Sequence, residues 1–236
     1  MIAVPSGSTA VMARRTTDAA ETDELRKLWR ALDFYPTPPW AARAGAELIK
    51  RLDPHARRIW EPACGEGHMA DPLRAYFDTV EASDIHFHGY GAVHDFLGSD
   101  PQFFPALGEV DWVVTNPPFL LAADFLRRGL EVANRGVALL CRLAFLESET
   151  RYQLLYGDTP VTIVAPFTER VAMQLGSWNP KGSTATAYAW FVWIKGSNVR
   201  GQLEPIPPGA KKRLSRLHDV QQFAFKGDTP LLDGVE

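Results

Sequence analysis

Cysteine, long apolar runs and net charge are all scarce in this sequence, and each shortage excludes a class of protein. The two cysteines, Cys64 and Cys141, form no metal-ligand spacing, which indicates a reduced protein without a metal site. No apolar stretch approaches the ~18 residues of a membrane span. The N-terminus also lacks the basic start and apolar core of a secretory signal. We therefore expect a cytoplasmic protein that does not enter a membrane.

Composition indicates one soluble domain with short extensions. The chain has 236 residues, 46% of them hydrophobic and 22% charged, which suits a single α/β domain. We expect a flexible leader over residues 1–18, the catalytic domain over 19–200 and a basic C-terminal extension over 201–236. The net charge of −3 gives no global field for nucleic acid, so such a partner needs a local basic surface. The run from Lys211 to Arg216 either touches phosphate or is simply solvated.

Apolar β-branched segments alternate with segments of helical period along most of the chain. Thr37 is the expected N-cap of a helix that ends near Leu52. The alternation implies a mostly parallel sheet with helices on both faces, and the last strand can pair antiparallel at its end. The pattern predicts strands at 58–61, 80–84, 112–114, 136–141, 161–165 and 186–194, and helices at 22–32, 37–52, 69–77, 125–134 and 147–156.

A stiff corner follows the predicted strand at 112–114. Its sequence is Asn116-Pro117-Pro118-Phe119. The prolines cannot continue a strand ladder, and a residue that precedes proline is pushed out of the helical region. The corner therefore offers an amide side chain, free carbonyls and an aromatic face at the carboxyl end of a strand. In open α/β sheets ligands bind at that edge.

This corner suits the chemistry of an amine conjugated to a π system, such as adenine N6 or a carboxamide nitrogen. The lone pair of such a nitrogen is delocalised, which makes it a poor nucleophile. Hydrogen bonds from its N–H groups to the Asn116 side-chain oxygen and the Pro117 carbonyl favour a more pyramidal, reactive nitrogen. Phe119 offers a ring on which the planar group can stack. A plain surface turn is the alternative, but the preceding strand and the upstream glycine turn favour the functional interpretation.

A glycine turn between a predicted strand and a helix indicates a cofactor site. Residues 65–70 fit G-x-G-x-x-A, and Asp84 follows Gly67 by 17 residues, close to the spacing of a ribose-binding acid. Spacing alone therefore leaves NAD open. Charge argues against NAD, because a pyrophosphate is stabilised by the partial positive charge at a helix N-terminus. Glu61 and Glu66 flank this turn and would oppose a negatively charged ligand. Two carboxylates suit a ligand with an ammonium and a sulfonium, as in S-adenosylmethionine.

Most of these acidic residues also have a structural explanation. Glu66 can be solvated at a helix N-terminus, and Asp84 can cap the turn that follows its strand. Asp95 with Phe96 looks like an adenine-contacting pair, although an Asx-turn also explains the aspartate. Glu61, at the end of a strand, is the hardest to explain by structure alone.

Together these segments resemble the S-adenosylmethionine-dependent amino-methyltransferases, nearest the adenine-N6 DNA methyltransferases of the gamma-type motif order. The resemblance covers about residues 33–194. It implies a Rossmann-like class I methyltransferase fold, with a seven-stranded, mostly parallel sheet and one antiparallel strand. The cofactor it implies is S-adenosylmethionine. The catalytic motif would be Asn116, Pro117, Pro118 and Phe119, and the cofactor would contact Tyr35, Thr37, Glu61, Ala63, Gly65, Gly67, Asp84, Ile85, Asp95, Phe96 and Asn116.

Two departures from the family pattern affect the expected substrate. The aromatic residue is Phe119 instead of the commoner tyrosine, which is harmless because stacking needs only the ring. No segment is large enough for a separate target-recognition domain, so DNA is the expected substrate but adenine N6 of RNA and protein glutamine N5 stay open. A cofactor-binding module is a further alternative. A specificity partner or an oligomer could then supply recognition.

A polar loop at 176–183 is the expected second wall of the substrate pocket. Trp178 could stack on a base and Lys181 could meet a phosphate, although Trp178 could equally cap the sheet edge. Arg142, directly after a predicted strand, either faces the substrate or makes a structural ion pair.

Overall fold

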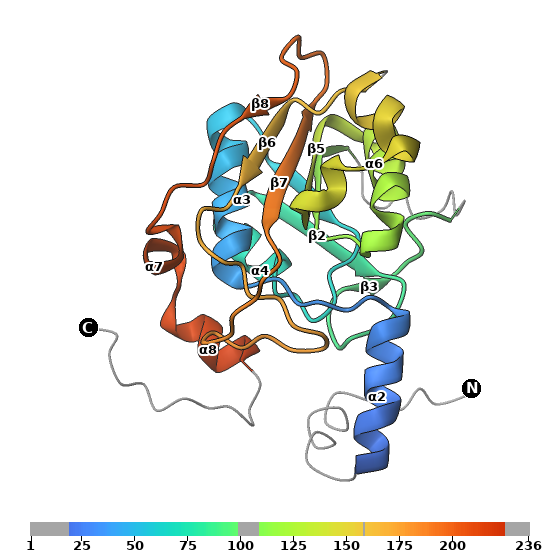
Figure 1. Cartoon of the computed structure of the whole chain (residues 1–236), viewed down its shortest axis with the longest axis vertical. Coiled ribbons are helices and arrows are strands. Elements are labelled where there is room, and N and C mark those ends of the chain that lie inside the picture. The colour runs from blue at the N-terminus through green and yellow to red at the C-terminus, as the bar shows by residue number, and fades with distance from the viewer. Residues whose placement is uncertain (1–18, 99–108, 158, 225–236) are drawn as a thin grey trace.

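A mixed β-sheet lies between two layers of helices (Figure 1) in the computed structural model, which describes residues 19–98, 109–157 and 159–224. The strands are β1 (Arg58–Glu61), β2 (Thr79–Asp84), β3 (Ala92–Val93), β4 (Val110–Thr115), β5 (Ala133–Arg142), β6 (Ile163–Pro166), β7 (Tyr188–Ile194) and β8 (Gln202–Leu203). They lie in the order β3-β2-β1-β4-β5-β7-β6-β8. Among these described strands only β7 runs antiparallel to its neighbours. This confirms the expected Rossmann-like sheet.

The sheet has eight strands where seven were expected. The additional strand is β8, which pairs in parallel with β6 at the sheet edge. Without β8, the edge of β6 would have unpaired carbonyls. The chain after Gly201 supplies the N–H groups that pair with them. The N–H groups of Glu204 and Ile206 donate to the carbonyls of Val164 and Pro166. The start of the expected C-terminal extension is thus part of the sheet.

Helices cover both faces of the sheet, as the alternating pattern predicted. They are α2 (Ala19–Ala31), α3 (Pro39–Leu52), α4 (Ala70–Leu73), α6 (Ala122–Val132), α7 (Ala210–Leu214) and α8 (Leu217–Phe223), with short 3-10 or π turns η2 (Phe119–Leu121), η3 (Leu143–Leu146), η4 (Glu149–Arg151) and η5 (Gln153–Gly157). Figure 1 shows α3 and α6 on opposite sides of the strands, and α2 projecting from the domain.

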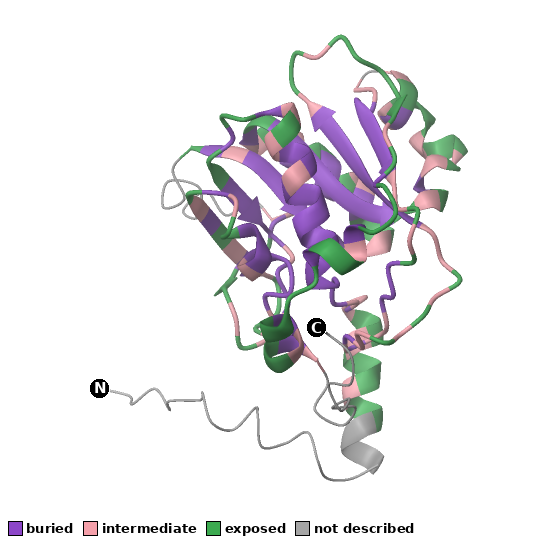
Figure 2. Cartoon of the chain, turned by 90° about the vertical axis from the view of Figure 1, so that its left-hand side faces the viewer, coloured by how far each residue is buried: buried purple, intermediate pink, exposed green. Residues whose placement is uncertain are grey.

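Side chains alternate between two buried clusters, one on each face of the sheet. In β4, Trp112 and Val114 pack in the cluster that includes α3, whereas Val113 packs in the cluster with Phe125 and Leu126 of α6. This alternation follows from the period of two along a strand. The central strands are therefore buried on both sides (Figure 2). Their carboxyl ends are held in a rigid frame.

Three local predictions are wrong. Thr37 does not cap α3, because Pro38 is the N-cap and its own carbonyl accepts from Ala41 N and Ala42 N. The helix expected over 69–77 is regular only over Ala70–Leu73, since Ala75 N and Tyr76 N bond to the carbonyls three residues back, Pro72 O and Leu73 O. The helix expected over 147–156 is replaced by η4 and η5. There the Arg151 side chain donates to the Glu147 carbonyl, which an α-helix would need for a backbone bond.

Residues 201–224 of the expected extension contact the domain through a buried ion pair. Arg43 of α3 and Asp219 of α8 are each 2% exposed and form two bonds of 2.7 and 2.6 Å. Arg213, within the basic run, pairs with Glu47 through two bonds of 2.6 Å. That arginine therefore has a structural partner. The leader at 1–18 and the final residues 225–236 lie outside the described residues.

None of the described helices has the length and apolar character that a membrane crossing requires.

Candidate active site

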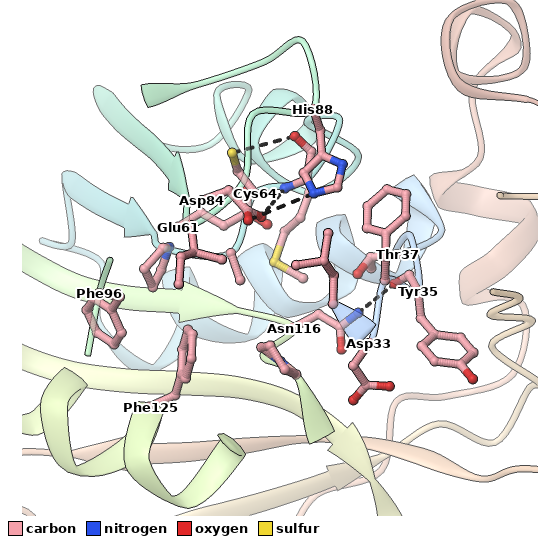
Figure 3. A pocket seen from close by; sticks show the side chains of 18 of the residues that line it. Asp33, Tyr35, Thr37, Glu61, Cys64, Asp84, His88, Phe96, Asn116 and Phe125 are labelled. Atoms are coloured by element: carbon pink, nitrogen blue, oxygen red, sulfur yellow. Dashed lines mark hydrogen bonds and ion pairs between the residues drawn. The ribbon is translucent and has the colours of Figure 1, made fainter. Parts of the chain in front are cut away.

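A cavity of about 270 Å³ opens at the carboxyl ends of β1, β2 and β4. Ligands of open α/β sheets bind at this edge. Figure 3 shows Glu61, Asp84 and Asn116 around the cavity. It brings together all of the expected cofactor residues except Gly67, namely Tyr35, Thr37, Glu61, Ala63, Gly65, Asp84, Ile85, Asp95, Phe96 and Asn116.

The glycine turn is shaped by two residues with positive φ. Gly65 has φ +51°, and a Cβ atom there would lie 2.6 Å from the ring of Phe34. Gly67 has φ +87°, and its Cβ would lie 2.7 Å from the ring of Tyr90. Side chains at either position would be strained and would collide with an aromatic ring. Gly67 thus shapes the turn from outside the cavity lining.

Asp84 connects the end of β2 to the glycine turn. Its Oδ2 accepts from Gly65 N at 2.9 Å, and its Oδ1 accepts from His86 N at 3.1 Å. The carboxylate is fixed at the cavity by these backbone bonds, and its side chain is 14% exposed. Both structural and ligand-binding roles are therefore compatible with this position.

Glu61 is a buried carboxyl group that lacks part of its hydrogen bonding. It is 2% exposed at the end of β1, and its Oε2 has no hydrogen-bond partner within residues 19–98, 109–157 and 159–224. Burial raises the pKa of Glu61 well above its usual range, and the negative charge of Asp84 raises it further. A buried acceptor without a partner is costly. A cationic donor entering the cavity would satisfy it.

Hydrogen bonds from its nitrogen hold the side-chain amide of Asn116 in one orientation. Its Nδ2 donates to the Tyr35 carbonyl at 2.9 Å and to Met173 Sδ at 3.6 Å. Its Oδ1 is buried and has no hydrogen-bond partner among the described residues. The Tyr35 contact comes from the turn before α3, so two distant segments orient one amide. The oxygen is available to an N–H donor that enters the cavity.

Phe119 lies just beyond the cavity lining, as does Pro117, whereas Pro118 lines it. The Phe119 N–H donates to Asp33 Oδ2 at 2.6 Å. The Tyr35 ring centroid lies 5.4 Å from the Phe119 centroid, at an interplanar angle of 42°. The guanidinium carbon of Arg142 lies 4.1 Å from the same centroid. The ring is thus fixed between an aromatic and a cationic neighbour.

The structure does not bring the expected second wall to this cavity. Trp178 is 5% exposed, and its backbone bridges to Ala224. Lys181 is exposed, and neither residue lines the cavity. The loop folds back on the domain, where Gly176 N donates to the Phe34 carbonyl. Trp178 packs as part of the core in this structure.

Sequence reasoning missed several residues that line the cavity: Asp33, Phe34, His88 and Phe125. Phe34 and His88 stack with ring centroids 4.5 Å apart and an interplanar angle of 16°. Burial lowers the pKa of His88, although Asp84 opposes this change. The signals were proximity in sequence, since Asp33 and Phe34 directly precede Tyr35 and His88 follows Asp84 by four residues.

Comparisons with known proteins show similarity of fold. No protein-family model and no curated protein matches the sequence. A solved structure of a provisionally assigned RNA methyltransferase from Pyrococcus horikoshii is 16% identical, with a TM-score of 0.53 over 75% of this chain and 98% of that one. A type I restriction-modification methyltransferase subunit from Streptococcus thermophilus is 14% identical, with a TM-score of 0.55 over 83% of this chain and 51% of that one. The chain therefore has the Rossmann-like fold of class I methyltransferases.

Proposed function

We propose that this chain is an S-adenosylmethionine-dependent N-methyltransferase that modifies an amine conjugated to a π system, most specifically adenine N6 in DNA. The observation that carries the proposal is the buried Oδ1 of Asn116, to which no residue that the structure describes donates a hydrogen bond. A buried acceptor of this kind costs about 1–3 kcal/mol. An exocyclic amine supplies the N–H donor that would satisfy it.

The residues around the cavity fit the cofactor chemically. S-adenosylmethionine supplies a methyl group on a positively charged sulfur, together with an ammonium, a ribose and an adenine. Glu61 Oε2, buried and without a partner, suits the ammonium. Asp84, fixed at the cavity by Gly65 N, suits ribose hydroxyls. Phe96 and Phe125, with ring centroids 5.0 Å apart, offer apolar surface for the adenine.

The chain's contribution to the reaction is to position and activate the target nitrogen. Asn116 Oδ1 accepts from one N–H of the amine, and the Pro117 carbonyl offers a second acceptor. These bonds withdraw the nitrogen lone pair from the π system and direct it toward the donor. Phe119, fixed by its bond to Asp33, holds the plane of the target. Positioning and preorganised hydrogen bonds of this kind account for large rate enhancements.

Replacing Asp84 with alanine should weaken the binding of S-adenosylhomocysteine by about tenfold to a hundredfold. The change removes the proposed ribose acceptor and the anchor of Gly65. Isothermal titration calorimetry measures the effect, and Asp78→Ala is a matched control because Asp78 is exposed and pairs only with Arg57 among the ion pairs of the described residues. Unchanged affinity in Asp84→Ala would mean that β2 does not supply the ribose acid.

DNA is preferred as the substrate, and RNA is the second candidate. The restriction-modification subunit favours DNA, whereas the Pyrococcus horikoshii protein carries an RNA assignment. A duplex target would have to be flipped out of its stack to reach Asn116. This chain covers 51% of the restriction-modification subunit. The proposal also includes a specificity partner or an oligomer that supplies target recognition.

The test is transfer of radiolabel from S-adenosylmethionine to separate samples of mixed-sequence DNA, total RNA and protein extract. We expect label in DNA. Label in RNA or protein would keep the chemistry and replace the substrate. Cofactor binding without transfer to any sample would favour the binding-module alternative.

A further inference from the structure

A second, smaller pocket of about 170 Å³ has Phe119 in its lining. It is formed by residues from the end of β5, the turns η2, η3 and η4 and the start of α6. The linings of the two pockets share no residue: Pro118 lines the cofactor cavity, and its neighbour Phe119 lines the second pocket. The second pocket is lined by Phe119, Ala122, Cys141, Arg142, Ala144, Phe145 and Arg151. We call it the arginine pocket.

The arginine pocket is positively charged and has no acidic lining residue. Neither Arg142 nor Arg151 takes part in an ion pair among the residues that the structure describes. Burial raises the pKa of Cys141, so this thiol contributes no compensating negative charge. Two cations without a carboxylate repel each other, and an anion between them would relieve that repulsion.

The two guanidinium groups differ in how firmly they are held. Arg151 is fixed, because its Nε donates to the Phe145 carbonyl at 3.2 Å and its Nη2 to the Glu147 carbonyl at 2.9 Å. Arg142 is exposed and lies over the ring of Phe119, with its guanidinium carbon 4.1 Å from the centroid. The first is a preformed donor, and the second covers a ring that the proposed function needs.

We propose that the arginine pocket binds the phosphodiester of the nucleic-acid strand that carries the target base. The proposal rests on the proposed function. It adds that the backbone next to the target nucleotide lies on Arg151 and Arg142. Guanidinium groups suit phosphate because they donate two parallel hydrogen bonds.

Arg142 also covers Phe119 until the substrate arrives. A cation–π contact at an exposed site is weaker than the stacking of a base on an aromatic ring. Stacking of the base on Phe119 therefore displaces Arg142 from the ring, and the Arg142 guanidinium can then donate to the phosphate. The glutamine side chain of a peptide provides neither a base to stack on Phe119 nor a phosphate for Arg142, so it would not compensate for loss of the Arg142–Phe119 contact.

The experiment measures binding of labelled oligonucleotides to the full chain by fluorescence anisotropy over a series of salt concentrations, with S-adenosylhomocysteine present. The probes are single-stranded DNA, duplex DNA and RNA of one sequence. Arg142→Gln and Arg151→Gln should each weaken binding about tenfold. Each should also make the negative slope of log K against log salt shallower by about 0.7–0.9, because one phosphate contact is lost.

Arg200→Gln is the matched control, since Arg200 is exposed and lines neither pocket. It should leave both affinity and slope unchanged, and S-adenosylhomocysteine should bind all variants equally. Slopes unchanged in Arg142→Gln and Arg151→Gln would overturn the arginine pocket even if the protein methylates nucleic acid. Absence of methyl transfer to every nucleic acid would instead overturn the proposed function, whatever the slopes.

Discussion

Replacing Asn116 with alanine should abolish methyl transfer, a loss of about 10³-fold or more in kcat, while the affinity for S-adenosylhomocysteine changes little. The expected loss is comparable with removal of one preorganised hydrogen-bonding group at a reacting centre. No described residue donates to the Oδ1 of Asn116, so its removal breaks no hydrogen bond within the described part of the chain. The Nδ2 bond to the Tyr35 carbonyl is lost as well, which costs some local order.

Single-turnover transfer and calorimetric titration of the same preparation separate these effects. Asn134→Ala is the matched control, because Asn134 is exposed at the start of β5 and should leave both quantities unchanged. An Asn116→Ala protein that loses cofactor affinity together with transfer would identify the residue as a structural support of the cavity.

Replacing Glu61 with glutamine should weaken the binding of S-adenosylhomocysteine by about tenfold to a hundredfold. The same change should stabilise the protein in the absence of ligand. The affinity falls because the ammonium loses its charged acceptor. The stability rises because a buried carboxyl without full hydrogen bonding is replaced by a neutral group. Such an exchange of stability for binding is common at functional sites. An increase in Tm of about 2–4 °C corresponds to each ~1 kcal/mol recovered.

The pH dependence has a definite sign. The pKa of Glu61 is raised in the folded protein, so its contribution to stability is full below the unfolded pKa and is lost as pH rises through the folded pKa. The Tm advantage of Glu61→Gln should therefore grow with pH. Binding of the ammonium favours the ionised carboxylate, so wild-type affinity should rise with pH over about 5–8, where the α-ammonium of the ligand keeps its proton and the raised pKa of Glu61 lies above that of an ordinary glutamate.

Differential scanning fluorimetry and calorimetry over this pH range test both effects. Glu81→Gln is the control, because Glu81 is an exposed residue of the adjacent strand β2. If the Glu61→Gln protein had wild-type affinity at every pH, the ammonium could not be the group that Glu61 binds.

The positions of the functional strands follow from sequence because each carries its signal locally. The strand predicted at 58–61 coincides with β1, and the Asn116 corner follows β4 directly. Apolar period and proline chemistry are properties of adjacent residues, so they need no knowledge of the rest of the chain. The residues at the strand ends therefore meet at one edge, as the parallel order requires.

The remaining features depend on contacts between distant segments. Strand β8 has only two residues, too few for a period, and it forms because β6 offers an open edge. Phe34 reaches the cavity by packing where Gly65 lacks a side chain. Trp178 lies in a loop without period, so its sequence could not distinguish a base-stacking ring from one that is buried in the domain.

The most direct test of the central claim is the chemical position of the transferred methyl group. Modified nucleic acid would be digested to nucleosides and separated by liquid chromatography with mass spectrometry. Because Asn116 Oδ1 requires an N–H donor, we predict N6-methyladenine, formed by the wild-type protein and absent with Asn116→Ala. A methyl group on a ring nitrogen, a ribose oxygen or a carbon atom would contradict the role assigned to Asn116.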